Sequence, residues 1–387
     1  MSISDIKHSL RKLDFPASAK EALIRIEQLL VGRSAPSSKQ MDTTLDIISE
    51  FVFSEDRRGG RRGNGLNPLQ ELQLIEIICD YLSACTSETT KNTIFLSLFG
   101  GTDIQRQRLK ILTTLASMAV SACSTPVLLA VGVWLQQMGC SSPHSLQLVE
   151  TVICDHFVLN SGNQSSLKVL ANKAPQFVSN FITAVTELFK YDVQGNRRMP
   201  PRNLLEVITS WVYCNPTLCT SAQLQPAPLP LGAIPMAAVT PLAGLLHWCP
   251  FQFPKIKLEH SFEPSIVKTP AQKTLTESEL YIKLHLGVLQ SLRAGRRSGP
   301  PTAVNAQHLA SLAPIVHSYV QNLIKKGQSF HTDTKLQDCL DRIGQAVQVS
   351  LANGCVYGNI NSLLASLDIL PENRLLRIII RTHQQII

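Results

Sequence analysis

The chain has 387 residues, which at about 150 residues per domain is enough for two or three domains or for one elongated stack. Charged residues make up 17% of it and hydrophobic residues 44%, a composition that excludes global disorder. The 36 Lys and Arg against 28 Asp and Glu give a net charge of +8. This mild basic excess favours acidic partners, but it is smaller than a dedicated nucleic-acid-binding domain usually carries.

The N-terminal residues lack a basic segment followed by an apolar run, so we expect no secretory signal and an intracellular protein. The ten cysteines are scattered along a long chain, which favours reduced, mostly buried thiols over disulfides. Residues 207–254 form the only charge-free stretch long enough to span a membrane. They contain eight prolines, which break a continuous helix, so we expect no membrane span.

Apolar residues recur at helical spacing, which predicts an all-α fold. The clearest stripe is Leu336, Leu340, Ile343, Val347 and Leu351, with Asp338, Asp341, Arg342, Gln345 and Gln348 on the opposite side. Asn67 and Pro68 predict the start of another helix, because Asn caps helices well and Pro suits the first position. Its predicted buried face is Leu69, Leu72, Ile75, Cys79 and Leu82.

Further helices are expected over 17–31, 42–53, 88–98, 104–121, 126–137, 143–158, 175–190, 201–213, 236–248, 277–293, 303–326 and 359–368. Prolines stand where several of them begin, Pro371 marks one more start, and most connections are short. These features predict stacked antiparallel helical pairs, arranged as a HEAT-like solenoid. No repeat signature supports the solenoid, which is inferred from helix lengths and short loops alone.

Three segments interrupt this pattern. Residues 54–66 form a Gly- and Arg-rich basic loop, 215–235 a Pro-rich crossing packed against helices, and 250–276 a linker. The predicted domains are therefore an N-terminal helical stack over 1–249, the linker, and a C-terminal helical region over 277–387. A second short basic loop is expected over 294–301.

No phosphate-binding loop, nucleophile elbow, zinc helix or dinucleotide-binding turn occurs in the sequence, and the Cys and His spacings do not match a structural zinc site. We therefore expect no metal, no cofactor and no enzyme, although a site assembled by the fold stays an alternative. Trp134, Trp211 and Trp248 lie on apolar faces and are expected in the core, with a role at an interface as the alternative.

Arg57, Arg58, Arg61, Arg62, Arg296 and Arg297 are the candidate contacts for RNA or for an acidic partner. Guanidinium groups bind phosphate and carboxylate bidentately, and the neighbouring glycines allow close approach. No aromatic residue is interleaved with them, so a solvated charged loop is the competing interpretation.

Ten strings, taken in order, resemble the Integrator complex subunit 15 family. They are residues 4–10 (SDIKHSL), 50–53 (EFVF), 66–76 (LNPLQELQLIE), 117–120 (SMAV), 134–136 (WLQ), 181–186 (FITAVT), 204–208 (LLEVI), 240–249 (TPLAGLLHWC), 280–290 (LYIKLHLGVLQ) and 340–349 (LDRIGQAVQV). They are packing patterns and not chemical motifs, so the resemblance identifies a family and no mechanism.

The resemblance implies a helical, non-catalytic scaffold in the nucleus, within the Integrator assembly that processes small nuclear RNA and acts on RNA polymerase II transcription. It implies binding to the module of Integrator subunits 10, 13 and 14, indirect association with RNA polymerase II, and no small-molecule substrate. The alternative is a nucleic-acid-binding helical protein that acts through the loops of Arg57–Arg62 and Arg296–Arg297.

Overall fold

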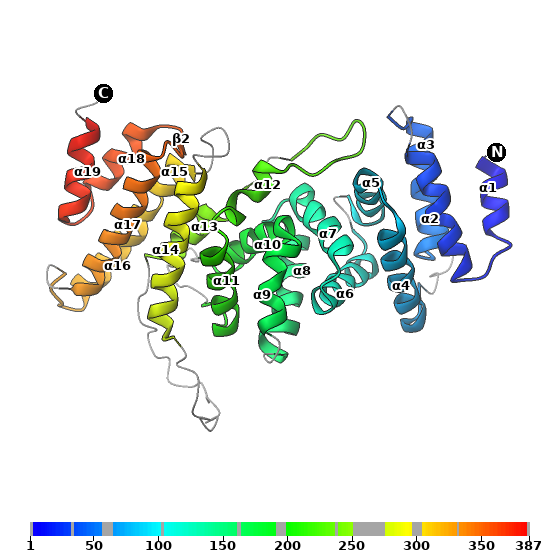
Figure 1. Cartoon of the computed structure of the whole chain (residues 1–387), viewed down its shortest axis with the longest axis horizontal. Helices are drawn as coiled ribbons and strands as arrows, with labels where there is room; N and C mark the ends of the chain where they lie inside the picture. The colour runs from blue at the N-terminus through cyan, green and yellow to red at the C-terminus, as the bar shows by residue number, and fades with distance from the viewer. Residues whose placement is uncertain are drawn as a thin grey trace, which may run out of the picture. The chain divides into compact units, whose positions relative to one another are not determined.

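The computed structural model describes residues 3–31, 35–55, 65–101, 104–160, 164–190, 199–236, 239–250, 275–295, 304–330 and 333–384. Nearly all regular structure in these ranges is helical (Figure 1). The exception is a parallel pair of two-residue strands, β1 (Val304–Asn305) and β2 (Val356–Tyr357). The predicted all-α class is confirmed, and the HEAT-like solenoid stays a prediction.

Contacts group the chain into two compact units. Unit 1 comprises Met1–Leu188 and Gln225–Val239, and unit 2 comprises Phe189–Leu224 and Thr240–Ile387. Residues 189–224 and 240–249, which the sequence assigns to the N-terminal stack, therefore group with the C-terminal helices. The reason is that α11 (Arg202–Cys214) packs on α14 (Glu277–Gly295), the helix that follows the expected linker. Residues 251–274 of that linker lie outside the described residues, so the linker stays a prediction.

Unit 1 contains helices that pack on near neighbours in the chain. They are α1 (Ile3–Leu10), α2 (Ala17–Leu30), α3 (Ser38–Ile47), η1 (Ile48–Val52), α4 (Pro68–Ala84), α5 (Glu88–Phe99), α6 (Arg106–Ala122), α7 (Thr125–Met138), α8 (Pro143–Ile153), η2 (Cys154–Leu159), α9 (Gln164–Lys173) and α10 (Pro175–Leu188). Here α2 packs on α3, α6 on both α7 and α8, and α10 on α7. Of these contacts, α2 on α3 and α6 on α7 join consecutive helices, as the predicted stacking of helical pairs expects.

The core of unit 1 is closely packed. Phe99 contacts Phe53 and Phe95, with ring centroids 5.9 and 5.1 Å apart, and its carbonyl accepts a 2.8 Å hydrogen bond from the indole of Trp134. Gly132 on α7 permits the close approach of α10, because a Cβ there would lie 2.9 Å from backbone atoms of Phe177.

Trp134, Trp211 and Trp248 are all buried, so their predicted place in the core is confirmed.

Unit 2 is built around two long helices. Its elements are α11 (Arg202–Cys214), η3 (Leu218–Thr220), α12 (Ser221–Leu224), α13 (Leu242–Trp248), α14 (Glu277–Gly295), α15 (Ala306–Ala310), α16 (Leu312–Lys325), α17 (Thr334–Ala352), α18 (Ile360–Asp368) and α19 (Arg374–Gln384), together with β1 and β2. Here α11 packs on α14, α14 on α17, and α17 on α19. The predicted stripe on α17 is buried from Leu336 to Val347.

Several predicted elements differ from the structure. The helix expected over 236–248 is shorter and begins at Leu242, and the one expected over 303–326 is divided at Ser311 into α15 and α16. On α4 the buried residues are Leu74, Ile75, Ile78 and Leu82, whereas Leu69 and Leu72 are exposed. The helices α1, α9 and α12 were not predicted, and of α19 only a start near Pro371 was expected. No helix in the described ranges is both long enough and apolar enough to cross a membrane.

Candidate interaction surfaces

The six candidate arginines lie outside the described residues. Arg57, Arg58, Arg61 and Arg62 fall within 56–64, and Arg296 and Arg297 fall within 296–303. These candidate contacts therefore stay a prediction, and the structure shows instead what holds the residues on either side of each segment.

The residues before segment 56–64 are fixed to α6 by an ion pair. Arg108 on α6 donates to both carboxylate oxygens of Glu55, and its Nε lies 2.6 Å from Oε1. Both side chains are largely buried. The guanidinium also donates to the hydroxyl of Ser49 and lies 4.6 Å from the centre of the Phe53 ring. A buried bidentate pair of this kind holds the backbone at Glu55 in one arrangement against α6.

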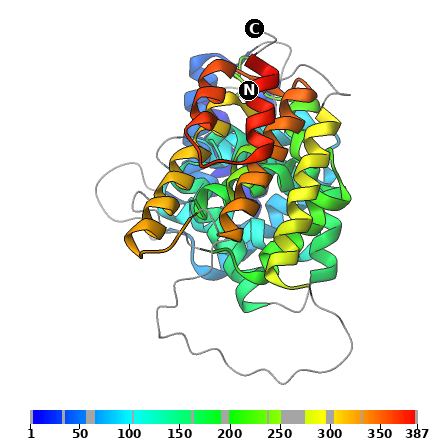
Figure 2. The ribbon, with the colours of Figure 1, turned by 90° about the vertical axis from the view of Figure 1, so that its left-hand side faces the viewer.

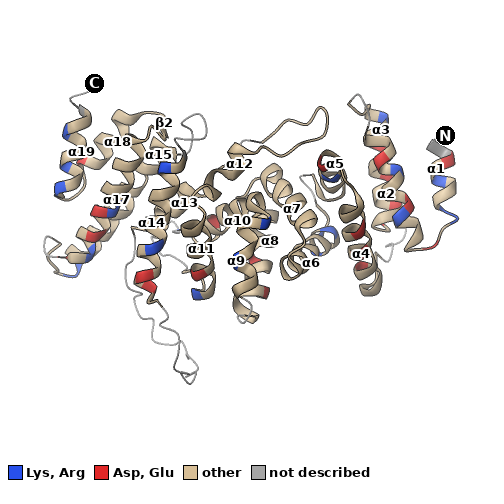
Figure 3. Cartoon of the chain, viewed as in Figure 1, with Lys and Arg blue, Asp and Glu red and all other residues tan. Residues whose placement is uncertain are grey.

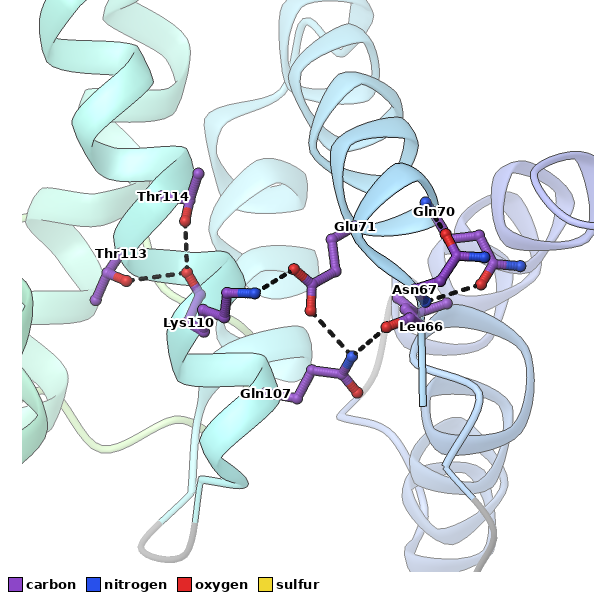
Figure 4. A network of polar contacts seen from close by, with 8 residues as sticks. All are labelled: Leu66, Asn67, Gln70, Glu71, Gln107, Lys110, Thr113 and Thr114. Atoms are coloured by element: carbon purple, nitrogen blue, oxygen red, sulfur yellow. Dashed lines mark hydrogen bonds and ion pairs between the residues drawn. The ribbon is translucent and has the colours of Figure 1, made fainter. Parts of the chain in front are cut away.

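The residues after segment 56–64 are held by the same turn of α6 (Figure 4). Gln107 donates to the carbonyl of Leu66 at 2.8 Å and to Glu71 at 3.1 Å, and Lys110 donates to Glu71 at 2.7 Å. Burial alone would raise the pKa of Glu71, but the hydrogen bonds from Lys110 and Gln107 lower it. Asn67 and Gln70 complete a reciprocal capping box at the start of α4. Both ends of the basic segment are thus fastened to the first turns of α6.

The residues around segment 296–303 are joined by one buried residue. The thiol of Cys355 donates to the carbonyl of Leu292 at 3.0 Å, and the carbonyl of Cys355 accepts from the backbone N–H of Val304 at 3.1 Å. Cys355 therefore ties the last turn of α14 to the start of β1. The predicted loop is bounded by fixed backbone on both sides.

A further surface was not predicted as a site. We name residues 225–236 and Val239 the Pro-rich arm. The backbone of the arm is largely free of helix, and it is held to unit 1 by polar contacts: Asn92 donates to the carbonyl of Pro228 at 2.8 Å and Gln136 to that of Met236 at 3.1 Å. Most of its apolar side chains are exposed, Ile234 by 85%, whereas Ala227, Leu229 and Pro230 are half-buried.

The crossing expected over 215–235 is thus extended in its second half, where hydrogen bonds attach the backbone and most of the apolar side chains are not buried. Leu231, Met236 and Val239 are exposed in the same way as Ile234. No charged residue occurs between 207 and 254, so the arm presents an apolar surface without charge. The absence of charge was the available sequence signal, since exposed loops are usually polar.

A second pair of exposed apolar side chains lies on α4. Leu69 is 66% and Leu72 is 54% exposed, one turn apart and just after the residues that anchor the basic segment. The sequence predicts both in the core. That prediction is wrong. The neighbouring helices cover the stripe of Leu74, Ile75 and Ile78 on the same helix, which leaves the other two leucines exposed.

One cluster has the residue types of a hydrolase but not the geometry. Ser117 donates to Asp155 at 2.6 Å, and His156 Nε2 lies 3.1 Å from the Ser117 hydroxyl and 3.0 Å from its carbonyl oxygen. A carbonyl only accepts, so Nε2 must carry the proton and has no lone pair for the hydroxyl. Asp155 contacts the serine and does not orient the imidazole, as a triad requires. The cluster fastens η2 to α6. The described residues contain no group of three or more His, Cys, Asp and Glu side chains arranged to hold a metal ion.

Comparison with known proteins agrees with the resemblance seen in the sequence. The family model of Integrator complex subunit 15 matches residues 4–372. The Integrator complex subunit 15 of Drosophila melanogaster is 35% identical over 399 residues, which cover 100% of both chains. The proteins of the same name from Mus musculus and Homo sapiens are each 31% identical and cover 98% of this chain and 87% of their own length. The chain belongs to the Integrator complex subunit 15 family.

Proposed function

We propose that the chain is a non-catalytic adaptor subunit of the nuclear Integrator complex. In this role it binds the module of subunits 10, 13 and 14, associates with RNA polymerase II only indirectly, and supports small nuclear RNA 3′-end processing and transcription termination. The name shared by its relatives supports membership of Integrator. The assignment to that module and to these processes follows from the family resemblance.

The Pro-rich arm is the observation that carries the adaptor role. An exposed apolar surface of this kind is unfavourable in water, and a partner that covers it removes it from water. Burial of one large aliphatic side chain contributes about 1.5–3 kcal/mol to the free energy of binding. The bonds from Asn92 and Gln136 hold the arm before the partner arrives, which lowers the entropy lost on association. Adaptor work needs such apolar anchors and no titratable groups.

The absence of catalysis is part of the same proposal. The Ser117 cluster is occupied by structural hydrogen bonds, and the relatives are named as a subunit of a complex and not by a reaction. No metal, cofactor or small-molecule substrate is required for the adaptor role.

The arm can be tested by changing its exposed side chains in the whole protein. The double variant Ile234→Asp/Met236→Asp is expected to lose at least about tenfold in affinity for the reconstituted module of subunits 10, 13 and 14, because charge would enter an apolar interface. Its Tm is expected to match the wild type. Leu159→Asp, on an equally exposed apolar residue of the same unit, is the control and should bind normally. Unchanged binding by the arm variant would contradict this role of the arm.

Nucleic-acid binding through Arg57, Arg58, Arg61, Arg62, Arg296 and Arg297 is the second candidate function. The hydrogen bonds that fix the backbone on both sides of each segment favour this function. Fixed flanking backbone reduces the conformational entropy that a loop loses when it binds. Replacement of all six by Ala should then abolish RNA binding, and the affinity of the wild type should fall steeply with salt. Equal RNA affinity at low and high salt would exclude it.

A further inference from the structure

The helix α19 carries a row of arginines on one side. Arg374, Arg377 and Arg381 are all exposed, whereas Leu376, Ile379 and Ile380 are buried against the rest of unit 2. At 100° per residue the three arginines fall within an arc of about 60° and span about 10 Å along the axis. Figure 3 shows basic residues along α19 on the side away from α17, and in Figures 1 and 2 α19 is the outermost helix of its unit.

Two of these arginines have no ionic partner among the described residues. Arg374 and Arg381 form no ion pair there, and Arg377 pairs with Glu372 beside the start of the helix. The charge of the arginine row is therefore only partly neutralised within the fold.

An ordinary terminal helix needs only a polar outer face, and α1 shows what that looks like in this chain. Lys7 pairs with Asp46 at 2.9 Å, and Arg11, just after α1, pairs with Glu50 at 2.8 Å. There, positive charge is balanced by acids of the neighbouring elements. The outer face of α19 instead combines charge of one sign with an apolar side chain, Ile378, which lies beside the arginines and is 52% exposed.

We propose that this outer face of α19, formed by Arg374, Arg377, Ile378 and Arg381, binds an acidic segment of a partner subunit. Carboxylates spaced along about two turns of a partner helix match the row, and each guanidinium donates two parallel hydrogen bonds to one carboxylate. An apolar side chain of the same segment covers Ile378, as in an interface with a small apolar centre and a charged rim. The inference rests on the proposed adaptor function.

A protein segment fits this face better than RNA does. Single-stranded RNA is held by basic residues interleaved with aromatic rings on which bases stack. The described part of α19 contains no Phe, Tyr or Trp, and its one histidine, His383, lies on the other side of the helix from the arginine row, which presents the aliphatic Ile378 instead. Arginine next to an exposed aliphatic side chain is typical of a protein interface.

The test uses the full chain and purified Integrator complex that lacks this subunit. The variant Arg374→Glu/Arg381→Glu is expected to bind the complex at least about tenfold more weakly than the wild type, and Arg374→Lys/Arg381→Lys to retain part of the affinity. Lys325→Glu/Lys326→Glu changes the net charge equally at exposed positions at the C-terminal end of α16 and serves as the control, with normal binding expected. A photoreactive benzoylphenylalanine placed at position 378 should crosslink to a segment rich in Asp and Glu.

The outcomes separate this inference from the proposed function. If the wild type binds the complex and the arginine variant binds equally well, the α19 inference is wrong and the adaptor function stands. Crosslinks to RNA alone, or only to segments without an acidic excess, would also overturn it. If the wild type does not bind the complex, both the adaptor function and the α19 inference fail.

Discussion

Leu340 illustrates what hydrophobic periodicity predicts at the scale of one residue. The sequence places it on the buried stripe of its helix, and the structure buries it completely. An Asp there would carry an unpaired charge into the core. Leu340→Asp is therefore expected to reduce the free energy of unfolding by several kcal/mol, at least about 3, whereas Gln348→Asp on the exposed face should cost less than about 1 kcal/mol. Equal changes in urea unfolding would show that the two faces are misassigned.

Gln345 illustrates what periodicity does not predict. Its place on the polar face was foreseen, but its side-chain oxygen lies 3.0 Å from Nε2 of the buried His285 on α14, sixty residues away in sequence. Burial lowers the pKa of His285 to about 4, the hydrogen bond to Gln345 raises it, and the charge of Arg342 lowers it. Such a pairing depends on which helices become neighbours, which a single sequence does not give.

His285 makes the stability of the protein dependent on pH. Between pH 6.5 and about 4 the unfolded chain binds a proton at this imidazole that the folded chain does not bind, so stability falls as the pH is lowered through this range. The expected loss from this group between pH 7 and pH 5 is about 2 kcal/mol.

Urea unfolding of the wild type and of His285→Gln at both pH values measures the contribution of His285. The variant should lose about 2 kcal/mol less than the wild type on acidification, because glutamine does not titrate there. An identical loss in both proteins would mean that the imidazole titrates normally in the folded state.

At the scale of elements, most helices followed from spacing and from start signals such as Asn67 and Pro68. The failures have physical causes. On α4 two apolar stripes overlap, and only the packing of neighbouring helices selects Leu74 and Ile78 over Leu69 and Leu72. The π-helical turns η1 and η2 each depart from the α-helical hydrogen-bond pattern, for which hydrophobic spacing gives no signal. In α19 the helical spacing of Arg374, Arg377 and Arg381 among aliphatic residues indicated an amphipathic helix with a basic face, and this signal was not recognised.

The attachment of the Pro-rich arm depends on a small number of polar contacts. Asn92→Ala removes the hydrogen bond to Pro228, so the arm should leave unit 1 more often and be cleaved faster by thermolysin, which cuts beside exposed aliphatic residues. The helices should remain intact, with little change in circular dichroism. Thr114→Ala, at an exposed position of α6, is the control and should leave the cleavage rate unchanged. An unchanged rate in Asn92→Ala would show that the bond does not hold the arm.

At the scale of the whole molecule, composition and periodicity were sufficient for the all-α class but not for the division into units. The Pro-rich arm belongs to unit 1 although helices of unit 2 precede and follow it, a long-range arrangement that local patterns do not contain. The candidate site of six arginines lies outside the described residues and stays a prediction. The six arginines stand out as charges, whereas an exposed apolar surface becomes visible only when the helices that would have covered it are known.

The central claim is that the chain works as an adaptor in Integrator through apolar contacts. Affinity purification of the tagged full chain from nuclear extract, at moderate and at high salt, with mass spectrometry of the retained proteins, tests it most directly. The account predicts that Integrator subunits, including 10, 13 and 14, remain in stoichiometric amounts at high salt, because apolar contacts are not screened. Recovery of nucleic acid without these subunits, or their loss at high salt, would contradict it.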